Sequence, residues 1–335
     1  MGEWVALLRF PQSTSFPASS ARVETGCTGS DVAAKLSAFK LNDSQANAIL
    51  SCVTGTWRDG EQTKCRVLTW APTNTAVSQV ASHLLALRKQ HPATDGGCHG
   101  DLLLFGNRDR MAIDGNLSEI FLDTRVKRLW KCFSPTTGWR HCLDSLVAFL
   151  GEPMAVKSQY HQACCQQRDG TKLPEASFIR SRLNQIFQKL SSCLRTIMSH
   201  VPKAILLEKN YKNIVSVIKM LEDFSKLLDR KMAGNDVDVA VFMITSGMRC
   251  DGFGSAGGVG NALVENLMRN KTAILGVTRT LLRDLKLPVT RSDFKIKKFC
   301  LRSASFIFCT VSGSAKLNAQ KMDLLLIDEA GQLKE

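Results

Sequence analysis

The chain has 335 residues, of which 44% are hydrophobic and 22% charged, a composition that excludes an intrinsically disordered protein. It carries 44 lysines and arginines against 30 aspartates and glutamates, and the resulting formal charge of +14 favours a polyanionic partner such as nucleic acid. No apolar run approaches the roughly 20 residues that a membrane-spanning helix needs. The twelve cysteines lack the spacing of a disulfide scaffold. We therefore expect an intracellular protein of the nucleus or cytoplasm, without a membrane partner.

Residues 1–37 are polar and interrupted by glycines and prolines, and this pattern predicts an irregular leader. Ordered structure is expected from residue 38 onward. Residues 66–71, RVLTWA, form a short apolar run that predicts a buried strand. Thr73 or Asn74 can cap the helix that should follow this strand, because both side chains accept hydrogen bonds from backbone N–H groups.

The middle of the chain, residues 91–290, is expected to be mainly helical apart from a short strand near residues 102–105. Apolar residues recur at helical spacing over residues 179–197 and again over residues 211–228. These two stretches predict an antiparallel helical hairpin. A further helix is expected from about residue 261 to residue 285.

Two nearly continuous apolar runs close the chain, at residues 306–311 and 323–327. Strands of this kind are typical of a parallel sheet that is covered on both faces. Strands that alternate with helical stretches indicate an α/β fold. The sequence therefore predicts a parallel sheet interrupted by a large, mainly helical insertion.

An acidic pair follows the last of these strands. Asp328 and Glu329 stand where the carboxyl end of a strand in an open α/β sheet meets its ligands. A nucleotide hydrolase holds Mg²⁺ on a carboxylate at this position, and a second carboxylate can take a proton from the attacking water. An ordinary strand end with two solvated acids is the alternative interpretation.

Three segments taken together resemble superfamily 1 helicases. The box Asp328-Glu329-Ala330-Gly331-Gln332 resembles their Walker B element, residues 71–77 (APTNTAV) resemble the second conserved element, and residues 41–45 (LNDSQ) resemble the glutamine motif. The segments occur in the family's order. The likeness is greatest to the senataxin-like and RNA-surveillance helicases, including a large plant set.

This resemblance implies a RecA-like domain of the P-loop NTPase type that uses ATP and Mg²⁺ and acts on RNA or DNA. It implies that Asp328 binds Mg²⁺, Glu329 activates the attacking water and Gln332 senses the γ-phosphate. Gln45 would contact adenine. The nucleic acid would be contacted by Pro72, Thr73, Asn74 and Thr75, whose hydroxyls and amide suit phosphate oxygens. A plain strand-to-helix turn is the alternative for this last segment.

The phosphate-binding loop of the family, G-x-x-x-x-G-K-[ST], is missing from the sequence. Residues 55–62 retain two glycines at the required spacing but place Glu61 and Gln62 where Lys and Ser or Thr belong. The acidic Glu61 would repel phosphate. The chain also stops directly after the acidic box, so we expect it to lack the second RecA-like domain and to be inactive by itself.

The expected organisation is therefore an irregular leader at residues 1–37, the start of the RecA-like domain at 38–90, the helical insertion at 91–290 and the end of the RecA-like domain at 291–335. A partial ATP-dependent helicase is the leading hypothesis. A non-catalytic module that binds nucleic acid or a protein partner, and a truncated gene product without function, stay open.

Overall fold

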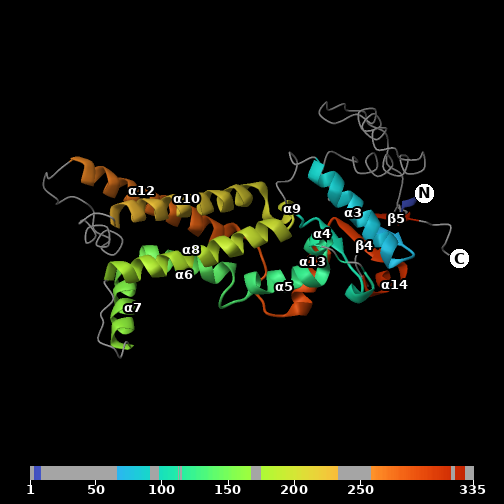
Figure 1. Ribbon diagram of the computed structural model, residues 1–335, viewed down its shortest axis with the longest axis horizontal. Helices are drawn as coiled ribbons and strands as arrows, with labels where there is room; N and C mark the ends of the chain where they lie inside the picture. The colour runs from blue at the N-terminus through green and yellow to red at the C-terminus, as the bar shows by residue number, and fades with distance from the viewer. Residues whose placement is uncertain are drawn as a thin grey trace, which may run out of the picture. The chain divides into compact units, whose positions relative to one another are not determined.

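The structure, a computed structural model, describes residues 4–8, 66–90, 98–111, 113, 115–166, 175–232, 258–317 and 321–328 (Figure 1). The chain divides into two units, the first made of residues 1–126 and 297–335 and the second of residues 127–296. The described strands all belong to the first unit, and the second unit is helical in its described part.

A five-stranded sheet organises the first unit. Its strands are β1 (Trp4–Leu8), β2 (Val67–Ala71), β3 (Leu102–Leu104), β4 (Phe306–Thr310) and β5 (Leu324–Asp328), in the spatial order β1-β5-β2-β4-β3. The last four strands in this order run parallel, and β1 pairs antiparallel with β5. The predicted α/β fold with a parallel sheet is confirmed, and the helical unit is inserted in the chain between β3 and β4.

Strand β2 lies at the centre of the sheet, between β4 and β5. Its side chains are almost all buried, as expected for a strand that is covered on both faces. Val67 pairs with Phe306 of β4 on one side and with Leu324 of β5 on the other. Arg66, just before β2, aligns the three strand beginnings. Its backbone N–H donates to the carboxylate of Asp323 at 2.8 Å, and its guanidinium donates to the carbonyl oxygens of Leu301, Ala304 and Lys321.

Helix α3 (Asn74–Gln90) follows β2, as the sequence predicts, and covers one part of the sheet. Its buried face packs on strands β3 and β4 and on the segment that follows β3. The cluster contains Ala71, Ala76, Val77, Ala81, Leu85, Leu102, Leu104, Met111, Leu117, Ile120, Phe121 and Phe308. Removing this apolar area from water, at about 25 cal/mol per Å², is the main force that holds α3 on the sheet.

Residues 4–8 correct one expectation. The sequence places them in an irregular leader, but they form β1, with Trp4 paired with Asp328 and Leu8 with Leu324. The expectation fails for these residues because the partner of β1 lies at the opposite end of the chain. A local pattern of five residues cannot reveal such a pairing.

Short helices complete the first unit. They are η2 (Arg108–Arg110), α4 (Gly115–Ile120), α14 (Val311–Ser314) and η3 (Ala315–Leu317). The division between the units falls within α5 (Leu122–Phe133) and within α13 (Asp293–Ser303).

The second unit is built from long helices that lie side by side along its length (Figure 1). Helix α6 (Trp139–Gly151) packs on α8 (Glu175–His200), α8 on α10 (Glu208–Met232), α10 on α12 (Gly258–Asp284), and α12 on α6. Helix α7 (Pro153–Gln166) packs on α6 and α8, and the short α9 (Lys203–Leu206) joins α8 to α10. The predicted helical hairpin is confirmed as α8 and α10.

Apolar side chains that recur along each helix explain this packing. Leu183, Leu190 and Ile197 of α8 and Ile214 and Leu221 of α10 are each at most 1% exposed. Within the described residues, none of the helices is both long enough and apolar enough to cross a bilayer.

Candidate active site at the edge of the sheet

The carboxyl ends of β2, β4 and β5 meet at one edge of the sheet. Ala71, the last residue of β2, pairs with Thr310, the last residue of β4. On the other side of β2, Trp70 pairs with Ile327, so Asp328 leaves β5 next to the end of β2. Side chains from three separate parts of the sequence therefore gather at this edge, which is where open α/β sheets bind their ligands.

The segment after β2 contains four of the residues that the sequence singles out. The hydroxyl oxygen of Thr73 accepts a hydrogen bond of 3.1 Å from the backbone N–H of Ala76, and Asn74 begins α3. Thr73 is therefore the helix cap, which is one of the two roles predicted for it; the other is a contact with nucleic acid. Thr73 and Thr75 are exposed, whereas Pro72 and Asn74 are partly buried. The segment presents hydroxyl groups to solvent at the start of a helix.

Asp328 occupies the end of β5, and its side chain is 8% exposed. The interior behind it is apolar, with Leu324, Leu326 and Ile327 buried along the strand. A carboxylate in this position is a suitable ligand for Mg²⁺. In the described part of the chain, however, no group of three or more His, Cys, Asp or Glu side chains is arranged to hold a metal ion.

Thr310 and Ser312 join this edge, although the sequence analysis does not single them out. The hydroxyl oxygens of these two residues lie 3.3 Å apart, and the backbone N–H of Gly313 donates to Thr310 Oγ1 at 3.2 Å. The hydroxyl-rich run Thr-Val-Ser-Gly-Ser at residues 310–314, which begins within the predicted strand at 306–311, was the signal that could have indicated them. Parallel pairing with β2 explains why this turn lies beside residue 71.

Burial in the sheet, just before its edge, changes the pKa of one thiol. Burial raises the pKa of Cys309 in β4 to about 12, and the neighbouring Trp70 of β2 acts in the opposite direction. Cys309 is therefore a neutral thiol, and it adds no negative charge beneath the candidate site.

The structure brings Asp328 and the segment at residues 72–75 together at one edge, but three other predicted residues lie outside the described residues. These are Gln45, Glu329 and Gln332. Residues 55–62, which take the place of the phosphate-binding loop, lie outside them as well.

The donor set at the edge does not fit a complete Mg²⁺–nucleotide site. It offers a carboxylate and several hydroxyls, but the sequence contains no Gly-Lys-Ser or Gly-Lys-Thr to supply a cradle and a cation for the phosphates. Without such a cradle, Asp328 has no held phosphate to assist.

Comparison with known proteins gives one match. A family model described as an AAA domain matches residues 48–335, which is most of the chain. No curated protein and no solved structure matches the chain.

Proposed function

We propose that this chain, which belongs to the AAA domain family within the superfamily 1 helicase group, is part of an ATP-dependent RNA or DNA helicase and does not hydrolyse ATP by itself. The observation that carries the proposal is the sheet edge, where Asp328 ends β5 and residues 72–75 directly follow β2, the strand beside it. A nucleic-acid-dependent motor places an acidic residue and a nucleic-acid-binding segment at such an edge, together with a phosphate-binding loop. The missing Gly-Lys-Ser/Thr supports the second part of the proposal.

Nucleic acid is the ligand that we assign to the segment after β2. The exposed Thr75 hydroxyl is a donor that suits phosphate oxygens, and so are the first N–H groups of α3, apart from that of Ala76, which donates to Thr73 Oγ1. The chain's charge of +14 adds an attraction that does not depend on base sequence. Contacts to phosphate do not distinguish RNA from DNA, because the two differ in their 2′-hydroxyl groups and bases. Both nucleic acids are therefore candidates.

An ATPase assay on the purified full chain tests the catalytic half of the proposal. We expect turnover at background, with and without single-stranded RNA or DNA, because no group cradles the phosphates. Asp328→Asn should leave this background unchanged. Turnover that nucleic acid stimulates, and that Asp328→Asn abolishes, would contradict the proposal.

Binding of a labelled oligonucleotide tests the other half. Thr75→Ala should weaken binding by a fewfold, because it removes one exposed donor at the sheet edge. Ser82→Ala is the matched control, since Ser82 is a partly exposed hydroxyl about two turns further along α3, away from the strand ends. Equal effects of the two substitutions would count against a nucleic-acid contact at residues 72–75.

The alternative of a non-catalytic binding module has one specific observation in its favour. Helix α8 contains Arg180, Arg182, Lys189 and Arg195 but no acidic residue after Glu175. A basic helix outside the sheet would hold a polyanion without any nucleotide. Strong, salt-sensitive binding of nucleic acid that Thr75→Ala leaves unchanged would favour this alternative.

A further inference from the structure

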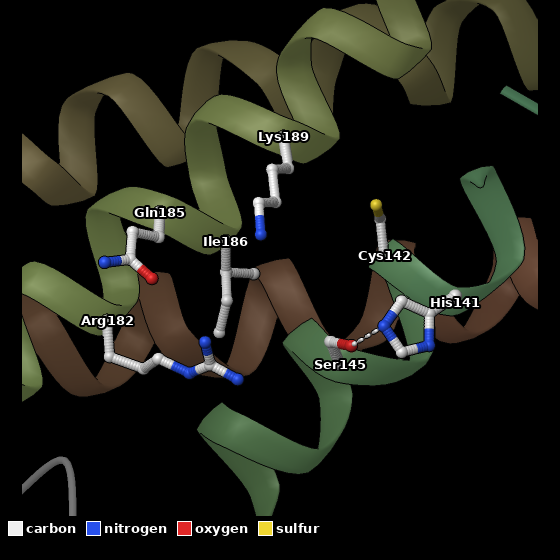
Figure 2. Close-up of a pocket in the computed structure, with 7 residues that line it drawn as sticks. All are labelled: His141, Cys142, Ser145, Arg182, Gln185, Ile186 and Lys189. Atoms are coloured by element: carbon white, nitrogen blue, oxygen red, sulfur yellow. Dashed lines mark hydrogen bonds between the residues drawn. The ribbon is translucent and has the colours of Figure 1, made fainter. Parts of the chain in front are cut away.

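A small cavity lies in the second unit between α6 and α8, and none of the residues of the sheet edge contributes to it. Its volume is about 50 Å³, which by comparison with a buried water is room for about four water-sized groups. Seven residues line it: His141, Cys142, Ser145, Arg182, Gln185, Ile186 and Lys189. Figure 2 shows this pocket with the α8 side chains on one side and the α6 side chains on the other.

The basic side chains of the pocket come from one face of α8. Arg182 and Lys189 are two helical turns apart, so their side chains project in the same direction, and Gln185 lies between them. In Figure 2 the guanidinium of Arg182 and the ammonium of Lys189 both extend into the space between the two helices. Two cations therefore converge on one small volume.

Helix α6 adds hydrogen-bonding groups from the opposite side. His141 and Ser145 are one turn apart, and their side chains lie 3.4 Å from each other, Ser145 Oγ to His141 Nε2. Cys142 and Ile186 are buried and supply apolar lining. Burial raises the pKa of the Cys142 thiol, with Lys189 opposing this effect, so Cys142 contributes no negative charge.

None of the described residues that line the pocket is a carboxylate. Other basic residues of the same unit have partners: Arg195 pairs with Glu222 at 2.7 Å, and Lys209 pairs with Asp284 at 3.4 Å. In the part of the chain that the structure describes, neither Arg182 nor Lys189 forms an ion pair. Two like charges that face one cavity repel each other, and an anion between them would remove that cost.

We propose that this pocket binds a phosphate group, with Arg182 and Lys189 neutralising its charge and with Ser145, Gln185 and His141 as hydrogen-bonding partners. The group is either a phosphodiester of a nucleic-acid strand or free inorganic phosphate. The proposal goes beyond the function assigned to the sheet edge, because none of its residues belongs to that edge and it needs no ATP turnover.

Inorganic phosphate is the first probe, titrated into the full chain by isothermal titration calorimetry at low ionic strength. The test variant is Arg182→Gln with Lys189→Gln, and we expect it to weaken phosphate binding by at least about tenfold, the effect of losing charge-assisted hydrogen bonds. The matched control is Arg195→Gln with Lys212→Gln, which removes the same charge from exposed positions outside the pocket. Circular dichroism should show unchanged helix content in both variants.

A short single-stranded oligonucleotide without terminal phosphates is the second probe, followed by fluorescence anisotropy. Weaker binding in the test variant than in the control, together with competition by inorganic phosphate, would assign the pocket to a nucleic-acid backbone. Weaker binding of phosphate alone would assign it to the free ion. Equal affinities of the test and control variants for both probes, or no saturable phosphate binding by the parent chain, would overturn the proposal.

The test of the pocket is independent of the test of the sheet edge. Thr75→Ala reports on the edge and the α8 variants report on the pocket, so either proposal can fail while the other stands.

Discussion

The guanidinium of Arg125, on α5, donates a hydrogen bond of 2.6 Å to the carbonyl oxygen of Leu102, the first residue of β3. The same group also donates to the carbonyl oxygens of His99 at 2.6 Å and of Gly100 at 3.0 Å. Arg125 is fully buried, so one cation joins the helix to the turn that begins the outermost parallel strand.

Arg125→Met should therefore destabilise the first unit by about 3 kcal/mol or more, because buried carbonyl oxygens lose their donors. Arg125→Lys should be intermediate, since a single ammonium cannot reach all of these oxygens. Urea titration followed by circular dichroism measures both effects. A Met variant within about 0.5 kcal/mol of the parent would show that these hydrogen bonds contribute little.

Gly138 and Gly276 should respond to alanine in opposite directions. A Cβ on Gly138, which caps α6, would lie 2.8 Å from the backbone nitrogen of Ser134 and closer still to the carbonyl oxygens of Cys132 and Ser134. Gly138→Ala should therefore cost about 1–3 kcal/mol. A Cβ on Gly276, an exposed position within α12, meets nothing within 4 Å, and Gly276→Ala should stabilise by about 0.5–1 kcal/mol. Thermal unfolding of the two variants checks the signs, and a shared sign would refute the geometric argument.

Two tryptophans of the second unit differ in burial although both donate to backbone carbonyls. Trp139 Nε1 donates to Pro288 at 3.1 Å and Trp130 Nε1 donates to Arg291 at 2.9 Å. Trp139 is 1% exposed, whereas Trp130 is 38% exposed. Trp139→Phe should cost at least about 2 kcal/mol because it leaves a cavity and an unpaired carbonyl, while Trp130→Phe should cost less than about 1 kcal/mol. Comparable losses in urea titrations would contradict the role of burial.

The stability of the first unit should fall at alkaline pH. Burial raises the pKa of Cys309 to about 12 and that of Cys300 to about 11, whereas thiols in an unfolded chain ionise near about 8.5. Above that pH the unfolded chain releases protons that the folded chain retains, so stability is complete below about pH 8.5 and declines as the pH rises toward 11 and 12. Urea midpoints between about pH 8 and 10.5 should show this decline.

Cys309→Ala should make this decline shallower, because one of the two protons is then no longer released on unfolding. Ile307→Val, a change at a buried neighbour without a titrating group, should lower the stability at every pH and leave the slope as it is. Parallel slopes for the parent and Cys309→Ala would show that Cys309 does not cause the pH dependence.

Local patterns predicted four of the five described strands and the four longest described helices, α3, α8, α10 and α12. The apolar run at residues 66–71 corresponds to β2, and Thr73 caps α3 as a threonine at that position should. The helical periodicities became α8 and α10. These predictions succeed because burial on both faces of a strand, or on one face of a helix, is written into the spacing of neighbouring residues.

The candidate site was predicted only in part. Asp328 and residues 72–75 come to one edge as parallel strands require, but Thr310 at the end of β4 and Ser312 just after it were not singled out, although the strand itself was expected. Hydroxyl residues are common beside strand ends. Such a residue indicates a site only when its strand lies next to the strands that carry the other site residues. That order is not visible in the residues themselves.

By itself, the sequence determined the α/β class, the strands β2, β4 and β5, a helix that begins at Thr73 or Asn74, and the loss of the Gly-Lys-Ser/Thr loop, because each depends on residues close together in the chain. Only the tertiary structure decided the strand order, the pairing of β1 with β5 and the meeting of Arg182 and Lys189 with His141 and Ser145. Those relationships join distant residues through burial and backbone pairing, and local spacing does not encode them.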